Sequence, residues 1–187
     1  MALASIMLIY ETKLRGRFHR RILMAFIFLF VGLIILQSEK ATVYVLLCFF
    51  AAHICFVKAF YLDFSSAPQL DKATARLAIF LGILFSFTSY IYLRPYLGAF
   101  RIPALIYSFS MTLVIMMASF RRLRVNGASF VLILSASILL AATALIFAFN
   151  YFVASAEYNR IVIDAAFMLS IYLMVRGAVE RKLLVLE

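Results

Sequence analysis

Long apolar segments separated by short polar breaks make up most of this chain. Six of them lie at residues 22–36, 41–62, 77–93, 102–120, 128–149 and 161–175. A helix needs about 20 residues, and at least about 17, to cross the hydrocarbon layer of a bilayer. Four segments reach that length, and we expect the two of 15 residues, 22–36 and 161–175, to extend into their flanks. The pattern predicts an all-α fold, a multi-pass transmembrane helical bundle with six spans.

A seventh apolar segment, residues 1–10, is too short to cross a membrane. As a helix it would be about 15 Å long. It is either a half-span packed against its neighbours or the remainder of a longer helix.

Composition places the chain in lipid. Apolar residues make up 67% of the sequence and charged residues 14%, whereas soluble domains carry about 25% charged residues. A soluble domain of 187 residues could not hide so much apolar surface in its core. The one stretch that resembles a linker, residues 63–71, falls between two spans. We therefore predict a single integral membrane domain over residues 1–187.

Charge along the chain indicates topology. Of the 18 Lys and Arg residues, 14 fall in alternate loops, at residues 13–21, 58–76, 121–124 and 176–182. The positive-inside rule places these loops and the C-terminal tail in the cytoplasm, where the basic side chains should face anionic head groups. Asp63 and Asp71 should lie in one of these cytoplasmic loops. Because topology accounts for the net charge of +10, we expect no nucleic-acid partner.

The sequence lacks the common enzyme and metal motifs. It has no HExxH, GxSxG, Cys-x-x-Cys or Gly-rich phosphate loop. His19 and His53 are too few and too far apart to argue for a metal site. We expect neither a metal nor another cofactor.

Two ionisable residues stand out inside the apolar segments, where such groups are costly and usually face a bundle interior or a water-filled cavity. His53 is either a neutral imidazole bonded to a neighbouring helix or a group for proton transfer or substrate binding. Asp164 lies near the start of its segment, and we expect it to pair with Arg160, one helical turn earlier, at the membrane interface.

Five separate stretches carry a pattern that extends along the chain. They read FIFLFVGLIILQ (26–37), AAHICFVKAF (51–60), PYLGAFRIPALIY (95–107), ASILLAATALIFAFNYF (136–152) and SIYLMVRG (170–177). In this order they resemble segments of the YhhN family, the lysoplasmalogenase-like multi-pass membrane proteins. In the second stretch, Ala52, His53, Ala59 and Phe60 match the family's Ala-His-x-x-Tyr-x-x-Ala-Phe run.

The resemblance implies an eight-helix bundle that encloses a lipid-accessible cavity, in the bacterial inner membrane. It also implies hydrolysis of the vinyl ether bond of lysoplasmalogens. The two acidic positions of the family are occupied here by Leu33 and Ala144. The candidate substrate-binding residues that it implies are His53, Tyr107, Asn150 and Tyr172.

The missing acids leave three interpretations open. A vinyl ether is cleaved by protonating its carbon, after which water attacks the cation, so one acid and one carboxylate would suffice. Leu33 and Ala144 can supply neither. The preferred interpretation is a membrane protein that binds a membrane lipid, a lysophospholipid, in a cavity where hydrolysis is reduced or lost. The others are an active ether-lysophospholipid hydrolase that uses His53, and an unrelated small membrane transporter or structural protein.

Overall fold

The computed structural model describes residues 1–37, 42–66, 72–153 and 157–184, and within them it is helical almost throughout. The elements are α1 (Ala2–Thr12), α2 (Arg17–Leu36), α3 (Thr42–Phe64), α4 (Lys72–Leu93), η1 (Gly98–Phe100), α5 (Arg101–Ser119), α6 (Gly127–Phe152) and α7 (Glu157–Val179). Six of these helices are long and apolar enough to cross a membrane, which confirms the prediction of an all-α bundle with six spans.

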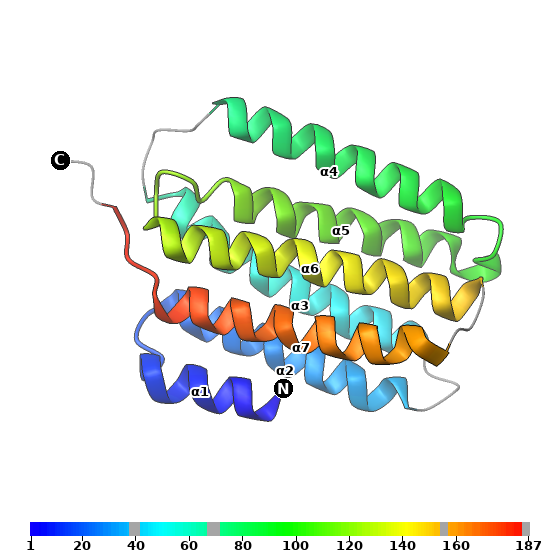
Figure 1. Cartoon of the computed structure of the whole chain (residues 1–187), viewed down its shortest axis with the longest axis horizontal. Helices are drawn as coiled ribbons and strands as arrows, with labels where there is room; N and C mark the ends of the chain where they lie inside the picture. Colours follow the sequence, from blue (N-terminus) through cyan, green and yellow to red (C-terminus); the bar gives the residue numbers. More distant parts are fainter. Residues whose placement is uncertain (38–41, 67–71, 154–156, 185–187) are drawn as a thin grey trace.

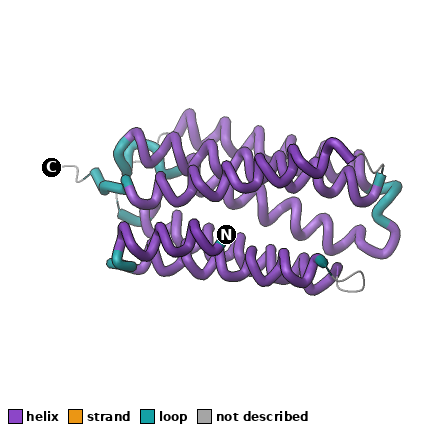
Figure 2. Tube along the Cα trace, turned by 60° about the horizontal axis from the view of Figure 1, so that its bottom comes forward, coloured by secondary structure: helices purple, strands orange, loops and turns teal. Residues whose placement is uncertain are grey.

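The long helices lie side by side, with their connections gathered at the two ends of the bundle (Figures 1 and 2). The two shortest apolar segments do extend into their flanks, because α2 begins at Arg17 and α7 begins at Glu157. Residues 2–10 fall in α1, a short helix that packs against α2 and α7 and buries Leu8 completely. The segment is thus a short helix packed against two neighbours.

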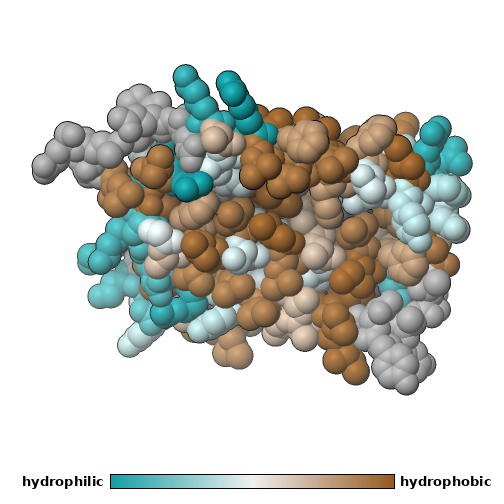
Figure 3. Space-filling view, turned by 45° about the horizontal axis from the view of Figure 1, so that its top comes forward, coloured by the Kyte–Doolittle hydropathy of each residue, from teal (hydrophilic) through white to brown (hydrophobic). Residues whose placement is uncertain are grey.

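The basic loops share one end of the bundle. The starts of α2, α4 and α6 and the ends of α3, α5 and α7 all lie at the end from which the C-terminal segment leaves (Figure 1). In the space-filling view, hydrophilic residues gather toward the ends and hydrophobic residues cover the middle (Figure 3). This arrangement is the one that a bilayer requires of a spanning bundle. We call this the basic end and the other the distal end.

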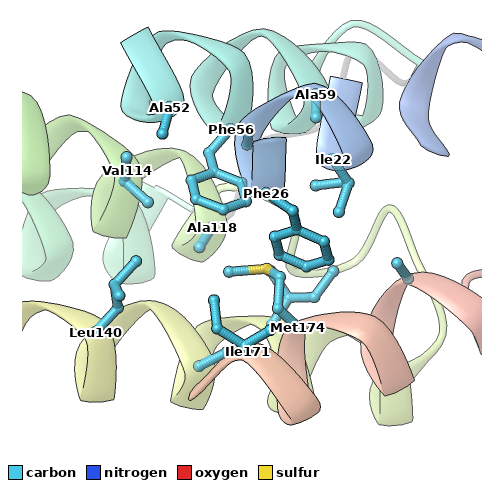
Figure 4. Close-up of a cluster of buried hydrophobic side chains, with 14 of the residues drawn as sticks. Ile22, Phe26, Ala52, Phe56, Ala59, Val114, Ala118, Leu140, Ile171 and Met174 are labelled. Atoms are coloured by element: carbon cyan, nitrogen blue, oxygen red, sulfur yellow. The ribbon is translucent and has the colours of Figure 1, made fainter. Parts of the chain in front are cut away.

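Aromatic rings and small residues fill the core between α2, α3, α5, α6 and α7 (Figure 4). The rings of Phe26 and Phe56 meet edge to face, with centroids 6.2 Å apart. Ala52, Ala59 and Ala118 are fully buried around them. Lipid tails are as apolar as leucine, so helices associate in a bilayer through close packing, and small residues allow the backbones to approach.

Gly177 provides a test of this packing at the contact between α6 and α7. A Cβ atom at Gly177 would lie 2.6 Å from Ile133 Cγ1 and 3.2 Å from the Ile133 backbone nitrogen. Because backbone cannot move aside as a side chain can, we expect Gly177→Ala to cost about 1–3 kcal/mol of stability. Thermal unfolding in detergent measures the effect. Gly127→Ala is the matched control, since nothing lies within 4 Å of a Cβ there, and equal midpoints for the two variants would contradict the prediction.

A buried charge cluster lies at the basic end. The prediction that Asp63 lies in a cytoplasmic loop is wrong: it belongs to the last turn of α3 and is 0% exposed. Arg121 Nε donates to Asp63 Oδ2 over 2.7 Å, and Arg181 Nε donates to Asp63 Oδ1 over 2.8 Å. Two guanidinium groups from distant parts of the chain therefore neutralise one buried carboxylate. Asp71 lies outside the described residues.

The environment of Arg121 corrects a second expectation. Arg121 and Arg124 are 0% and 2% exposed, so they do not face lipid head groups as predicted. Arg121 Nη2 also donates to Ser129 Oγ over 2.9 Å, and its guanidinium carbon lies 5.5 Å from the ring centroids of both Phe18 and Phe60. Burial lowers the pKa of the Arg121 guanidinium from its ordinary value, and the Asp63 carboxylate opposes that shift. The cluster therefore joins α2, α3 and α6 to the loop between α5 and α6, which carries Arg121, and to the segment after α7, which carries Arg181.

The C-terminal segment is tied down beside this cluster. The backbone N–H of Asn126 donates to the backbone carbonyl of Lys182 over 3.0 Å. The backbone N–H of Leu184 donates to the backbone carbonyl of Arg124 over 2.9 Å. These bonds flank an antiparallel bridge between Val125 and Leu183. The segment that follows α7 is thus fastened to the loop between α5 and α6.

Candidate functional site: an apolar cavity in the distal half of the bundle

A cavity of about 560 Å³ opens among the six long helices. Most of its lining comes from residues 29–36 of α2, 45–53 of α3, 85–93 of α4, 104–111 of α5, 140–152 of α6 and 163–168 of α7. Met1, Gln37, Leu97 and Phe100 complete it. Each of these stretches belongs to the half of its helix that lies away from the basic end (Figure 1). The cavity therefore occupies the distal half of the bundle.

The two positions that the family resemblance marks as acidic meet in this cavity. Leu33 comes from α2 and Ala144 from α6, and both belong to the lining. Positions more than 100 residues apart in sequence thus line the same cavity in the folded bundle. Their side chains are apolar, so neither exchanges a proton.

His53 enters the lining from the middle of α3. It is 1% exposed, and its Nδ1 lies 2.8 Å from Ser110 Oγ. The Ser110 hydroxyl donates its hydrogen to the Tyr107 carbonyl over 2.7 Å. A hydroxyl that donates to this carbonyl accepts at His53, and in that arrangement the imidazole proton lies on Nδ1. Nε2 is then a hydrogen-bond acceptor, and no described residue donates to it.

The other predicted site residues divide into two groups. Tyr107 lines the cavity, and its ring centroid is 5.0 Å from that of His53. Tyr172 is 52% exposed and lies outside the lining. Asn150 is half-buried and is also absent from the described lining, although the next two residues of α6 belong to it. The structure therefore brings His53, Tyr107, Leu33 and Ala144 together and leaves Asn150 and Tyr172 apart.

Asp164 is the cavity residue that the sequence interpretation placed elsewhere. It belongs to the lining, and its side chain is exposed. None of the ion pairs among the described residues joins it to Arg160, so the predicted interfacial pair is not formed. The sequence held one indication that Asp164 faces a cavity, namely its position four residues inside the span that begins at Arg160. A carboxyl group inside a span is expected to face a cavity.

The lining of the cavity is mostly apolar. Its polar groups are few: the acceptor of His53, the carboxyl of Asp164 and the hydroxyls of residues such as Tyr90 and Ser108. Among the described residues there is no group of three or more His, Cys, Asp or Glu side chains that could hold a metal ion.

The fold and this cavity define a polytopic α-helical membrane protein with a large, mostly apolar interior pocket. The family model described as YhhN matches residues 1–178, and the chain belongs to the YhhN family. The match confirms the resemblance to this family. No curated protein and no solved structure matches the chain.

Proposed function

We propose that this protein binds a single-chain lipid, a lysophospholipid, in the distal cavity and holds it without cleaving it. The observation that carries the proposal is the pair Leu33 and Ala144, which both line the cavity at the positions where the family resemblance implies acids. The volume of about 560 Å³ suits a small amphiphile, because ligand sites of this class measure about 300–1,000 Å³. The apolar lining is suited to a hydrocarbon chain.

Polar contacts must supply much of the preference for one lipid. An acyl chain that moves from the bilayer into the cavity leaves one apolar environment for another, so it gains little from the hydrophobic effect. The buried Nε2 acceptor of His53 offers a specific gain, since an unpaired buried acceptor costs about 1–3 kcal/mol. A lysophospholipid carries a free glycerol hydroxyl that can donate to this atom. A diacyl lipid lacks that hydroxyl.

The same tautomer argues against vinyl ether cleavage by His53. Cleavage starts with protonation of carbon, whereas the His53 proton on Nδ1 is held by Ser110 and Nε2 presents a lone pair. The second candidate function, an ether-lysophospholipid hydrolase that uses His53, is favoured by Asp164, whose carboxyl group lines the same cavity. We rank it second because the first step needs a proton donor, whereas His53 Nε2 is a hydrogen-bond acceptor.

We further propose that the protein resides in the bacterial inner membrane with its basic end and C-terminal tail in the cytoplasm. The support is the gathering of the basic loops at one end of the bundle. The cavity then lies in the half of the bilayer that faces away from the cytoplasm.

Lipid retention by purified protein tests the proposal. We expect detergent-purified protein to bind a lysoplasmalogen in equilibrium binding measurements and to release no aldehyde from it. Ala144→Phe places a ring in the cavity wall and should weaken binding at least about tenfold, a loss of about 1.4 kcal/mol. Ile138→Phe is the matched control, because Ile138 is on the same helix and 52% exposed.

Two results would overturn the proposal. If the unmodified protein binds no lysophospholipid, the cavity is not a lipid site. If it releases aldehyde and His53→Ala abolishes the release, the second candidate function is correct.

A further inference from the structure

We propose that a lipid enters and leaves the distal cavity sideways, through an opening between the distal halves of α2 and α7, directly from the bilayer leaflet at the distal end. This inference rests on the proposed function of the cavity and adds the route by which the ligand arrives. The competing route runs from water through the distal end of the bundle.

The two helices at this opening are neighbours that share few direct contacts. Among the described residues, α2 packs against α3 and α1, α7 packs against α6 and α1, and α2 and α7 do not pack closely against each other. In the core, side chains such as Phe26 and Met174 fill the space between them (Figure 4). Toward the basic end α1 covers the seam, and it reaches only part of the way along the bundle (Figure 1). In the distal half, the cavity takes the place of such a cover.

Exposed side chains in the lining mark the position of the opening. Phe30 and Ile34 of α2 line the cavity and are 45% and 54% exposed, and Met168 of α7 lines it and is 56% exposed. Asp164 of α7 is exposed as well. A side chain lines a cavity and also faces outward only where the wall is open. The described lining residues of α3, α4 and α5 are all buried or half-buried, and on α6 only Tyr151, at the distal end, is exposed.

The opening lies at the depth of acyl chains. α2 ends at Leu36, so Phe30 lies six residues, or about 9 Å, before its distal end. On α7, Asp164 and Met168 lie about 6 Å and 12 Å inside the span that begins at Arg160. The hydrocarbon core of a bilayer is about 30 Å thick, so these positions belong to the distal leaflet. A molecule that passes between them comes from the bilayer.

Polarity around the opening follows that of an amphiphile in this leaflet. Gln37 and Asp164 are its polar residues, and each lies on the distal side of an apolar one on the same helix, Phe30 on α2 and Met168 on α7. A lipid in the distal leaflet also has its head group at the distal surface and its chain toward the bilayer centre. It can therefore move into the cavity without turning over, with its chain passing between Phe30 and Met168.

Narrowing the opening tests the route. Ile34→Trp with Met168→Trp adds bulk on both sides of it. The matched control is Val31→Trp with Leu169→Trp, because these residues are 39% and 50% exposed on the same two helices and lie outside the lining. Uptake and release of a radiolabelled lysophosphatidylcholine are measured for protein in lipid nanodiscs. This probe has no vinyl ether, so cleavage of that bond cannot affect the rates.

We expect the narrowed variant to slow both uptake and release at least about tenfold, which corresponds to about 1.4 kcal/mol at the barrier. Affinity should change much less than either rate, because a higher barrier slows both directions equally. The control pair should exchange lipid at the rate of the unmodified protein. A second variant works in the opposite direction: Phe30→Ala widens the opening and should speed exchange. Its control is Ile27→Ala, which is 43% exposed and outside the lining.

The outcomes separate this inference from the proposed function. Equal rates for the narrowed and control pairs, or an unchanged rate in Phe30→Ala, would overturn the sideways route and leave the lipid site standing. Absence of lysophosphatidylcholine binding by the unmodified protein would overturn both. Phe30→Ala adds no bulk, so it decides the question even where the narrowed variant does not fold.

Discussion

Asp63→Asn will cost the protein about 3–5 kcal/mol of folding free energy, which is the usual cost of removing one partner from a buried ion pair. The carboxylate of Asp63 is 0% exposed and accepts hydrogen bonds from both Arg121 and Arg181. With the negative charge removed, Arg121 remains buried between α2 and α3 without a counter-ion. Thermal and denaturant unfolding in detergent measures the loss.

Two further variants show whether charge is the cause. Glu180→Gln breaks the ion pair with Arg176. The Arg176 side chain is 38% exposed and the Glu180 side chain 33% exposed. Ion pairs with this much exposure contribute about 0–1 kcal/mol to stability. It should therefore be nearly neutral. Asp63→Leu combined with Arg121→Met replaces the pair with apolar groups and should recover much of the loss. Equal effects of Asp63→Asn and Glu180→Gln would refute the explanation.

Restoring both acids, as Leu33→Asp with Ala144→Asp, will produce aldehyde release from a lysoplasmalogen that the unmodified protein does not show. General acid and base groups each contribute about 10²–10⁴ to a rate. Both positions line one cavity, so the new carboxyl groups reach the same ligand. We expect release at least about 100-fold above the background rate without protein, since one group of this kind supplies that much.

The single variants and a binding measurement complete that experiment. Each single restoration should be far less active than the pair, because protonation and water activation need separate groups. Lysolipid binding by the double variant shows that the cavity has survived the two new polar groups. A double variant that binds lysolipid and stays inactive would mean that this cavity does not present the vinyl ether to those positions.

The sequence alone determined the membrane class, the number of spans and the family. Those features are local. The free energy of moving a segment of about 20 residues into lipid is a sum over its own side chains, and the basic residues that indicate topology lie in or next to the connections between spans. The short helix α1 could be predicted for the same reason, from the length of residues 1–10.

Only the tertiary structure decided which polar groups meet. Asp63 contacts Arg121 and Arg181 across 58 and 118 residues of sequence, and hydropathy cannot show such a pairing because it scores each segment separately. The same limit placed Asp164 at the interface instead of in the cavity, and it left open whether Tyr172 turns inward. The rotation of each helix about its axis settles these questions. That rotation is set by packing against neighbouring helices, since all faces of a uniformly apolar helix are equivalent toward lipid.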